Sequence, residues 1–161
     1  MPCTRPPYNR RCDWHLPSPA SFAVVVALFS ACAAAEPASI EGRWVTFDSD
    51  TNQKRAVVEI VTVDRRATGR IIELFPKPGE DTDPVCENCP GEARGRRIRG
   101  LPILAVETED GGISYRGTVL DPEEGRSYRC VVTVGPGGTR LRLRGFISLE
   151  IFGRDETWVR E

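Results

Sequence analysis

Two cysteines three positions apart come closest to a known chemical motif. Cys86 and Cys89 form a Cys-x-x-Cys pattern, which in redox proteins normally sits at a helix N-terminus, where the macrodipole lowers the thiol pKa. Here Pro90 and Gly91 follow directly, and no helical periodicity begins. We therefore predict a disulfide between Cys86 and Cys89 that tightens a loop. A zinc site would need two further ligands, and only Cys130 remains in this part of the chain, so we predict no bound metal.

The single histidine restricts the available catalytic mechanisms. His15 lies in an N-terminal segment that has the features of an export signal. Without it the chain lacks the base of Ser-His-Asp and Cys-His mechanisms and the ligands of most zinc enzymes. Acid–base chemistry would fall to carboxylates, tyrosines or the two lysines, Lys54 and Lys77. We expect no cofactor, and we favour a non-enzymatic role while leaving catalysis open.

The segment 121–125 carries the best candidates for such carboxylate chemistry. Asp121, Glu123 and Glu124 lie close in sequence to Tyr128. A pair of carboxylates can cleave glycosidic bonds. In a turn containing proline and glycine, however, a leading aspartate usually accepts hydrogen bonds from backbone amides. We expect the structural role, and a hydrolase of envelope glycans remains the enzyme alternative.

Four aromatic residues are candidates for contact with a ligand: Trp44, Tyr115, Tyr128 and Trp158. Trp44 and Trp158 lie near the two ends of the domain, where we expect the first and last strands to pair. Packing in the core is the alternative role for both tryptophans. A further pattern places Arg140, Arg142 and Arg144 on one side of a strand, and we interpret it as a solubilising face.

The N-terminal residues 1–35 predict an export signal. An arginine-bearing start precedes the apolar run 22–35, whose 14 residues end in Ala33-Ala-Ala35. This order is typical of a secretory signal, and the run is shorter than the ~20 residues that cross a bilayer as a helix. We expect cleavage after Ala35 and release into the periplasm or the medium. Lipidation of Cys32, which would anchor the protein to a membrane, is the alternative.

Charge excludes some classes of partner. The chain has 22 basic and 23 acidic residues, so its overall balance gives no electrostatic signal for nucleic acid or an anionic membrane. The remainder after the export signal contains no apolar stretch long enough for an integral membrane helix. We expect no nucleic-acid partner and no membrane-spanning segment in the mature chain.

The residues after 39 predict short extended segments separated by turns. The strongest alternation of apolar and polar residues lies in 126–134 and 139–146, joined by a glycine-rich turn. The expected strands are 43–48, 55–63, 69–75, 98–106, 113–120, 126–134, 139–146 and 156–160. About eight antiparallel strands with one apolar face favour an all-β, up-and-down barrel over residues 40–160. A β-sandwich is the alternative, and the long segment 76–97 is expected to be a loop.

Several segments in this order resemble a known bacterial family. They are Gly42-Arg-Trp44, Cys86-Glu-Asn-Cys89, Gly100-Leu-Pro-Ile103, Tyr115-Arg-Gly-Thr-Val-Leu-Asp-Pro-Glu-Glu-Gly-Arg-Ser-Tyr128, Leu143-Arg-Gly-Phe146 and Gly153-Arg-Asp-Glu-Thr-Trp158. Over about 40–160 the chain resembles the domain of unknown function 2147. The resemblance implies an exported, β-rich, single-domain protein without an assigned activity. Gly42-Arg-Trp44 is also similar to the opening of lipocalin and fatty-acid-binding barrels.

These patterns predict a binding protein. Our leading hypothesis is an exported, non-enzymatic barrel that binds a small apolar molecule or a partner in the cell envelope. The hydrolase of envelope glycans is one alternative. The other is a structural or interaction module whose barrel interior is filled.

Overall fold

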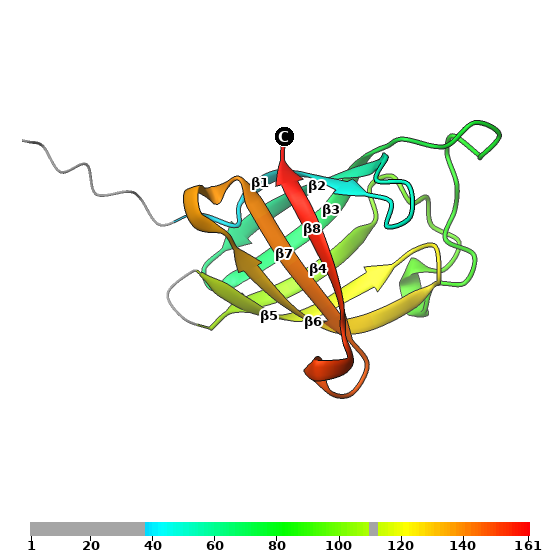
Figure 1. The fold of residues 1–161 in the computed structure, drawn as a ribbon. Helices are drawn as coiled ribbons and strands as arrows, with labels where there is room; N and C mark the ends of the chain where they lie inside the picture. Colours follow the sequence, from blue (N-terminus) through cyan, green and yellow to red (C-terminus); the bar gives the residue numbers. More distant parts are fainter. Residues whose placement is uncertain (1–37, 110–112) are drawn as a thin grey trace, which may run out of the picture. The chain divides into compact units, whose positions relative to one another are not determined.

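Eight antiparallel strands close into a barrel in which every strand pairs with its neighbours in sequence (Figure 1). The computed structural model describes residues 38–109 and 113–161. The strands are β1 (Gly42–Phe47), β2 (Lys54–Val63), β3 (Arg66–Leu74), β4 (Pro102–Thr108), β5 (Ser114–Asp121), β6 (Arg126–Val134), β7 (Arg140–Phe146) and β8 (Arg154–Arg160). β1 pairs with β8 through Trp44↔Arg160 and Val45↔Val159. This closure confirms the predicted barrel and excludes the sandwich.

Alternation of side chains sets the inner and outer faces. On β7, Leu141 and Leu143 are buried while Arg140 and Arg142 are exposed, as the period of two in a strand requires. The glycine-rich turn before β7 contains η2 (Pro136–Gly138), a short 3₁₀ turn. The sequence pattern was therefore sufficient to orient the strands with the clearest alternation.

Two strands start three or more residues away from the predicted position. β3 starts at Arg66 and not at residue 69, because the β2–β3 turn consists of only Asp64 and Arg65, with Asp64 at φ 56°. An aspartate tolerates this left-handed conformation in a two-residue hairpin. β4 starts at Pro102 and not at residue 98. The preceding residues stay in the loop, where the Ile98 amide donates to the Pro84 carbonyl at 2.9 Å.

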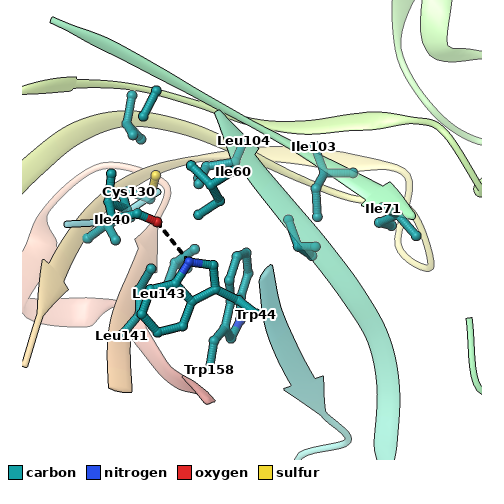
Figure 2. Close-up of a cluster of buried hydrophobic side chains, with 14 of the residues drawn as sticks. Ile40, Trp44, Ile60, Ile71, Ile103, Leu104, Cys130, Leu141, Leu143 and Trp158 are labelled. Atoms are coloured by element: carbon teal, nitrogen blue, oxygen red, sulfur yellow. Dashed lines mark hydrogen bonds between the residues drawn. The ribbon is translucent and has the colours of Figure 1, made fainter. Parts of the chain in front are cut away.

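One apolar cluster fills the barrel. Trp44, Ile60, Leu104, Leu141 and other inward side chains form it (Figure 2). Within 38–109 and 113–161, no polar or charged residue is buried. The interior is therefore a hydrophobic core of the kind that fills small eight-stranded barrels.

The long β3–β4 connection adds residues to this core. It includes η1 (Gly91–Ala93), and its Cys86, Cys89, Ile98 and Leu101 are buried in the apolar cluster. Charged contacts tie the connection to β2 and to the turn that precedes it. Lys77 binds Asp48 at 2.7 Å and Arg55 binds Glu80 at 2.8 Å. The connection thus covers one end of the barrel as part of the fold.

The barrel lies within one stretch of the sequence. All eight strands and the apolar cluster fall between Ile40 and Arg160. No helix in the described part of the chain is long and apolar enough to cross a membrane. The predicted export signal, with Cys32 and His15, lies outside the described residues, so signal cleavage and lipidation stay predictions.

Candidate binding surfaces

Three of the four candidate aromatic residues lie inside the barrel. Trp44 is 0 % exposed, Trp158 is 2 % and Tyr115 is 6 %. The two indole rings lie next to each other near the seam between β1 and β8 (Figure 2), where the sequence predicted that the terminal strands meet. No ring face is open to a ligand in this state. A molecule stacking on these rings would first have to displace other core side chains.

Tyr128 lies apart from these three residues. It is only half-buried, and its hydroxyl donates to the carboxylate of Glu124 on the β5–β6 turn. This hydrogen bond to a carboxylate raises the pKa of Tyr128. The structure therefore does not bring Tyr128 into one pocket with the buried aromatic residues.

A segment that precedes the first strand closes the second end of the barrel. Ile40 is 0 % exposed and packs in the core, although it belongs to no strand. The Trp44 indole donates to the Ile40 carbonyl at 2.8 Å. Arg160 donates to the carbonyls of Ser39 and Glu41 on either side. We call residues 39–41 the N-terminal plug. Side-chain hydrogen bonds, and no strand pairing, hold it in place.

The surroundings of the cysteines favour structural roles over chemical ones. Cys86 and Cys89 form the predicted disulfide, with their Cα atoms 5.5 Å apart. Burial raises the pKa of the Cys130 thiol to about 12, so it stays protonated and unreactive near neutral pH. In the described ranges, no cluster of histidine, cysteine, aspartate or glutamate is suited to hold a metal ion.

The carboxylates of the β5–β6 turn are occupied by structural contacts. Asp121 accepts hydrogen bonds from the backbone amides of Glu123 and Glu124, at 2.9 and 3.1 Å. Glu123 binds Arg55 at 2.6 Å. Glu124 accepts the Tyr128 hydroxyl. The turn is therefore held as a capped loop, and each of its three carboxylates has a structural partner.

An ion pair fixes the start of the long connection. Lys77 donates to Asp48, and this contact holds the pKa of the Asp48 carboxyl well below its usual range. The Thr51 amide and hydroxyl, each 2.8 Å from the same carboxylate, act in the same direction. The pKa of Lys77 is raised by the same pairing. This charged group is a structural anchor at the exposed edge of the loop.

A shallow open depression lies beside the β2–β3 turn. Its lining residues are Val63, Asp64, Arg65, Arg66, Thr68 and Glu107. Arg66 and Glu107 form an exposed ion pair at 2.7 Å within it. This depression is open to solvent, unlike the enclosed pockets that usually bind small molecules.

The β7–β8 loop gathers exposed apolar side chains, a feature that the sequence analysis missed. The exposed fraction is 74 % for Ile147, 61 % for Leu149, 75 % for Ile151 and 80 % for Phe152. The loop projects from the barrel body (Figure 1). We call residues 147–152 the apolar loop. Its sequence, Ile-Ser-Leu-Glu-Ile-Phe, alternates like a half-buried strand, so periodicity alone does not reveal that it is exposed.

The apolar loop is held in a defined conformation. It contains the 3₁₀ turn η3 (Glu150–Phe152). Arg144 on β7 donates to the carbonyls of Glu150 and Ile151, at 2.8 and 3.1 Å. At Gly153 a side chain would not fit, because its Cβ would lie 2.6 Å from the Gly145 carbonyl oxygen. The loop is therefore packed closely on β7 while its apolar side chains face solvent.

Comparison with known proteins supports this fold. A similar solved structure is protein HP1028 from the human pathogen Helicobacter pylori, described as belonging to the lipocalin family. The TM-score is 0.64 with 18 % sequence identity, over 78 % of this chain and 84 % of that chain. At this identity the likeness shows the fold alone, and no curated protein matches the sequence. A model of the bacterial family "Uncharacterized protein conserved in bacteria (DUF2147)" matches residues 42–160, so the chain belongs to that family.

Proposed function

We propose that this protein is a non-enzymatic binding module of the bacterial cell envelope, with the apolar loop as its binding surface. The proposal rests on a contrast in the exposure of apolar side chains between the barrel and this loop. Large apolar side chains are packed inside the barrel, whereas Ile151 and Phe152 are 75 % and 80 % exposed on one projecting loop. Soluble proteins rarely expose clustered apolar side chains unless a partner covers them.

The construction of the apolar loop favours a functional role over accidental exposure. Hydrogen bonds from Arg144 and close packing at Gly153 fix its backbone. Holding the backbone in place lowers the entropy that a loop loses when it binds. The filled barrel then acts as a rigid scaffold for the loop.

We further propose that the protein is exported and works in an oxidising compartment. The apolar run 22–35 with its small terminal residues supports export. The Cys86–Cys89 disulfide supports the same conclusion, because structural disulfides persist mainly outside the reducing cytosol.

Cell fractionation tests the proposed function. Residues 36–161 are exported behind a cleavable signal of known behaviour, which removes Cys32 from the experiment. We expect the wild-type barrel to associate with the envelope fraction and the Ile151→Ser/Phe152→Ser double variant to remain in the soluble periplasm. Val61→Ser/Val63→Ser is the matched control, since these valines are 46 % and 68 % exposed on β2 and lead into a turn at the opposite end of the barrel. Equal distribution of all three proteins would contradict the proposal.

A second candidate function is binding of a small apolar molecule inside the barrel. It is favoured by Ile40, which fills apolar interior space from outside the strands and is held by side-chain hydrogen bonds. Release of the N-terminal plug would open a site next to Trp44 and Tyr115. Native mass spectrometry and tryptophan fluorescence with a long-chain fatty acid test this candidate. Tighter binding by Ile40→Ala than by wild type would support it, and absence of binding to both would exclude that class of ligand.

A further inference from the structure

We propose that the apolar loop docks on an anionic phospholipid surface, with its apolar side chains among the acyl chains and flanking arginines at the phosphates. This inference rests on the proposed function and names its partner. It concerns reversible binding at the membrane surface by a folded barrel.

The side chains at the tip of the loop suit the boundary between headgroups and acyl chains. Ile151 and Phe152 are adjacent, and each is at least 75 % exposed. Ile147 and Leu149 extend the same apolar segment. Aromatic and long aliphatic side chains are the ones that peripheral proteins insert into this region.

The backbone of the loop meets the main requirement for entering an apolar phase. Unpaired backbone polar groups are costly there. The amides of Phe152 and Gly153 donate to the carbonyls of Leu149 and Glu150, each at 3.1 Å. Arg144 supplies donors to the carbonyls of Glu150 and Ile151. The loop therefore satisfies several of its own polar groups before it meets a membrane.

The acidic side chain in the loop is turned toward the barrel. Glu150 pairs with Arg116 on β5 at 3.3 Å. The next acidic residue, Asp155, is bound by both Arg142 and Arg144. Arginine contacts thus partly neutralise the negative charge close to the loop, which lowers the repulsion from an anionic surface.

Two exposed arginines also lie beside the loop, whereas the exposed Glu156 on β8 accepts the Trp158 indole N–H at 3.1 Å. Arg154 follows the loop directly, its side chain is 92 % exposed, and its ion pair with Glu124 is long at 3.9 Å. Arg129 stands opposite Phe146 in the β6–β7 ladder, with its guanidinium 5.8 Å from the centroid of that ring. Guanidinium groups bind phosphate oxygens well. The charge count of the whole sequence does not show where these two arginines lie.

A lipid surface fits these features better than a second copy of the chain. A symmetric dimer through the apolar loop would bring the Arg129 and Arg154 side chains of one copy near those of the other, because a two-fold interface joins the same patch on both partners. Like charges would then oppose the contact. Phospholipid phosphates have the complementary charge.

Sedimentation with unilamellar vesicles tests the inference, using residues 36–161 because this segment holds every strand and the apolar cluster. One vesicle set is phosphatidylcholine, and the other contains phosphatidylcholine and phosphatidylglycerol in equal parts. We expect wild type and Val61→Ser/Val63→Ser to bind the anionic vesicles alike. Ile151→Ser/Phe152→Ser should bind at least about tenfold more weakly. Arg129→Gln/Arg154→Gln should lose preference for the anionic vesicles by about fivefold per arginine at low salt.

The outcomes separate this inference from the proposed function. Equal binding of wild type and the apolar-loop variant to vesicles, or no binding by wild type, overturns the lipid inference. If envelope association in cells still depends on Ile151 and Phe152, the proposed function stands and the partner is a protein or a glycan. If wild type instead forms a dimer that the loop variant does not form, as measured by sedimentation velocity, the partner is a second copy. Circular dichroism and urea midpoints verify that every variant is folded.

Discussion

The guanidinium of Arg160 lies 4.2 Å from the ring centroid of Trp44 and joins the last strand to the first. The β1–β8 ladder contains only two register pairs, so this seam has few backbone contacts. Arg160 also donates to the carbonyls of Gly138, Glu41 and Ser39, at 2.5, 2.8 and 2.6 Å. One side chain therefore connects the N-terminal plug, the β6–β7 turn and the closing seam.

Replacing Arg160 should weaken the closure of the barrel. Arg160→Ala removes three hydrogen bonds and the contact with the Trp44 ring, so we expect a loss of about 2–4 kcal/mol in the free energy of unfolding. Arg160→Lys keeps the charge without the planar fork and should restore less than half of that loss. Urea unfolding monitored by tryptophan fluorescence measures both. Full rescue by lysine would show that charge alone matters.

Trp44 should contribute to stability through packing and through its indole N–H. Trp44→Ala leaves a large cavity in the core, and we expect a cost of about 3–5 kcal/mol. Trp44→Phe keeps much of the packing but leaves the Ile40 carbonyl without its donor, for a cost of about 1–2 kcal/mol. Equilibrium unfolding in urea distinguishes the two variants. A loss below about 1 kcal/mol for Trp44→Ala would mean that the ring is free to bind a ligand.

The sequence predicted the barrel because its signals are local. Alternation on β6 and β7, with a glycine-rich turn between them, determines which residues face inward. The disulfide was also predictable, since Pro90 and Gly91 argue against a helix beginning at Cys89. Closure through Trp44↔Arg160 was an inference from strand number, and the structure was needed to confirm it.

The sequence did not reveal features that depend on distant contacts. Ile40 looks like an ordinary linker residue, yet Arg160, 120 positions later in the sequence, holds the neighbouring carbonyls. The sequence of the apolar loop predicts a strand, because its apolar and polar residues alternate as in a half-buried strand. Tyr128 has the correct parity for the interior, but its position at the rim lets its hydroxyl reach Glu124. The position of all three in the folded chain depends on contacts between distant segments, which no local sequence pattern reveals.

The cysteines should differ in reactivity. In residues 36–161 without reductant, we expect no rapid alkylation at pH 8, because Cys86 and Cys89 are bonded and the Cys130 thiol has its pKa raised by burial to about 12. Unfolding in urea should expose one thiol, and added reductant should expose three. Cys86→Ser/Cys89→Ser should lose about 2 kcal/mol, as expected for a short disulfide ring. Two reactive thiols in the folded, unreduced protein would contradict the disulfide.

The Asp48–Lys77 pair should make stability depend on pH. The pKa of Asp48 is lowered in the folded state by Lys77, so the pair stabilises the fold above the ordinary aspartate pKa of about 3.9, and this contribution is lost as the pH falls below that value. The pKa of Lys77 is raised by Asp48, so the same contribution is also lost as the pH rises above about 10.4. Asp48→Asn should therefore lower the urea midpoint at pH 7.

Comparison across pH isolates the charge of Asp48. In the Asp48→Asn variant the amide side chain keeps an oxygen that can accept the Thr51 amide, so the substitution removes charge more than it removes the turn. The difference in urea midpoint between wild type and Asp48→Asn should narrow at pH 3, because part of the stabilisation by the charged wild-type carboxyl is already lost at that pH. Asp50→Asn, at an exposed position in the same turn, is the control. An equal difference at pH 7 and pH 3 would assign the effect to hydrogen bonding alone.

Substitutions in the turn that begins at Asp121 distinguish a structural from a catalytic role for its carboxylates. Asparagine at position 121 keeps a side-chain oxygen for the amides of Glu123 and Glu124, so Asp121→Asn should change the free energy of unfolding by less than about 1 kcal/mol. Glu123→Gln weakens an exposed pairing with Arg55 and should have a similarly small effect. In a carboxylate enzyme, removing the acid or base would instead lower the rate by ~10²–10⁴ while stability stayed nearly constant. Wild type is screened for hydrolysis of peptidoglycan and other envelope glycans, and any activity is measured again in both variants. Turnover that disappears in a well-folded Asp121→Asn protein would replace the binding module with an enzyme.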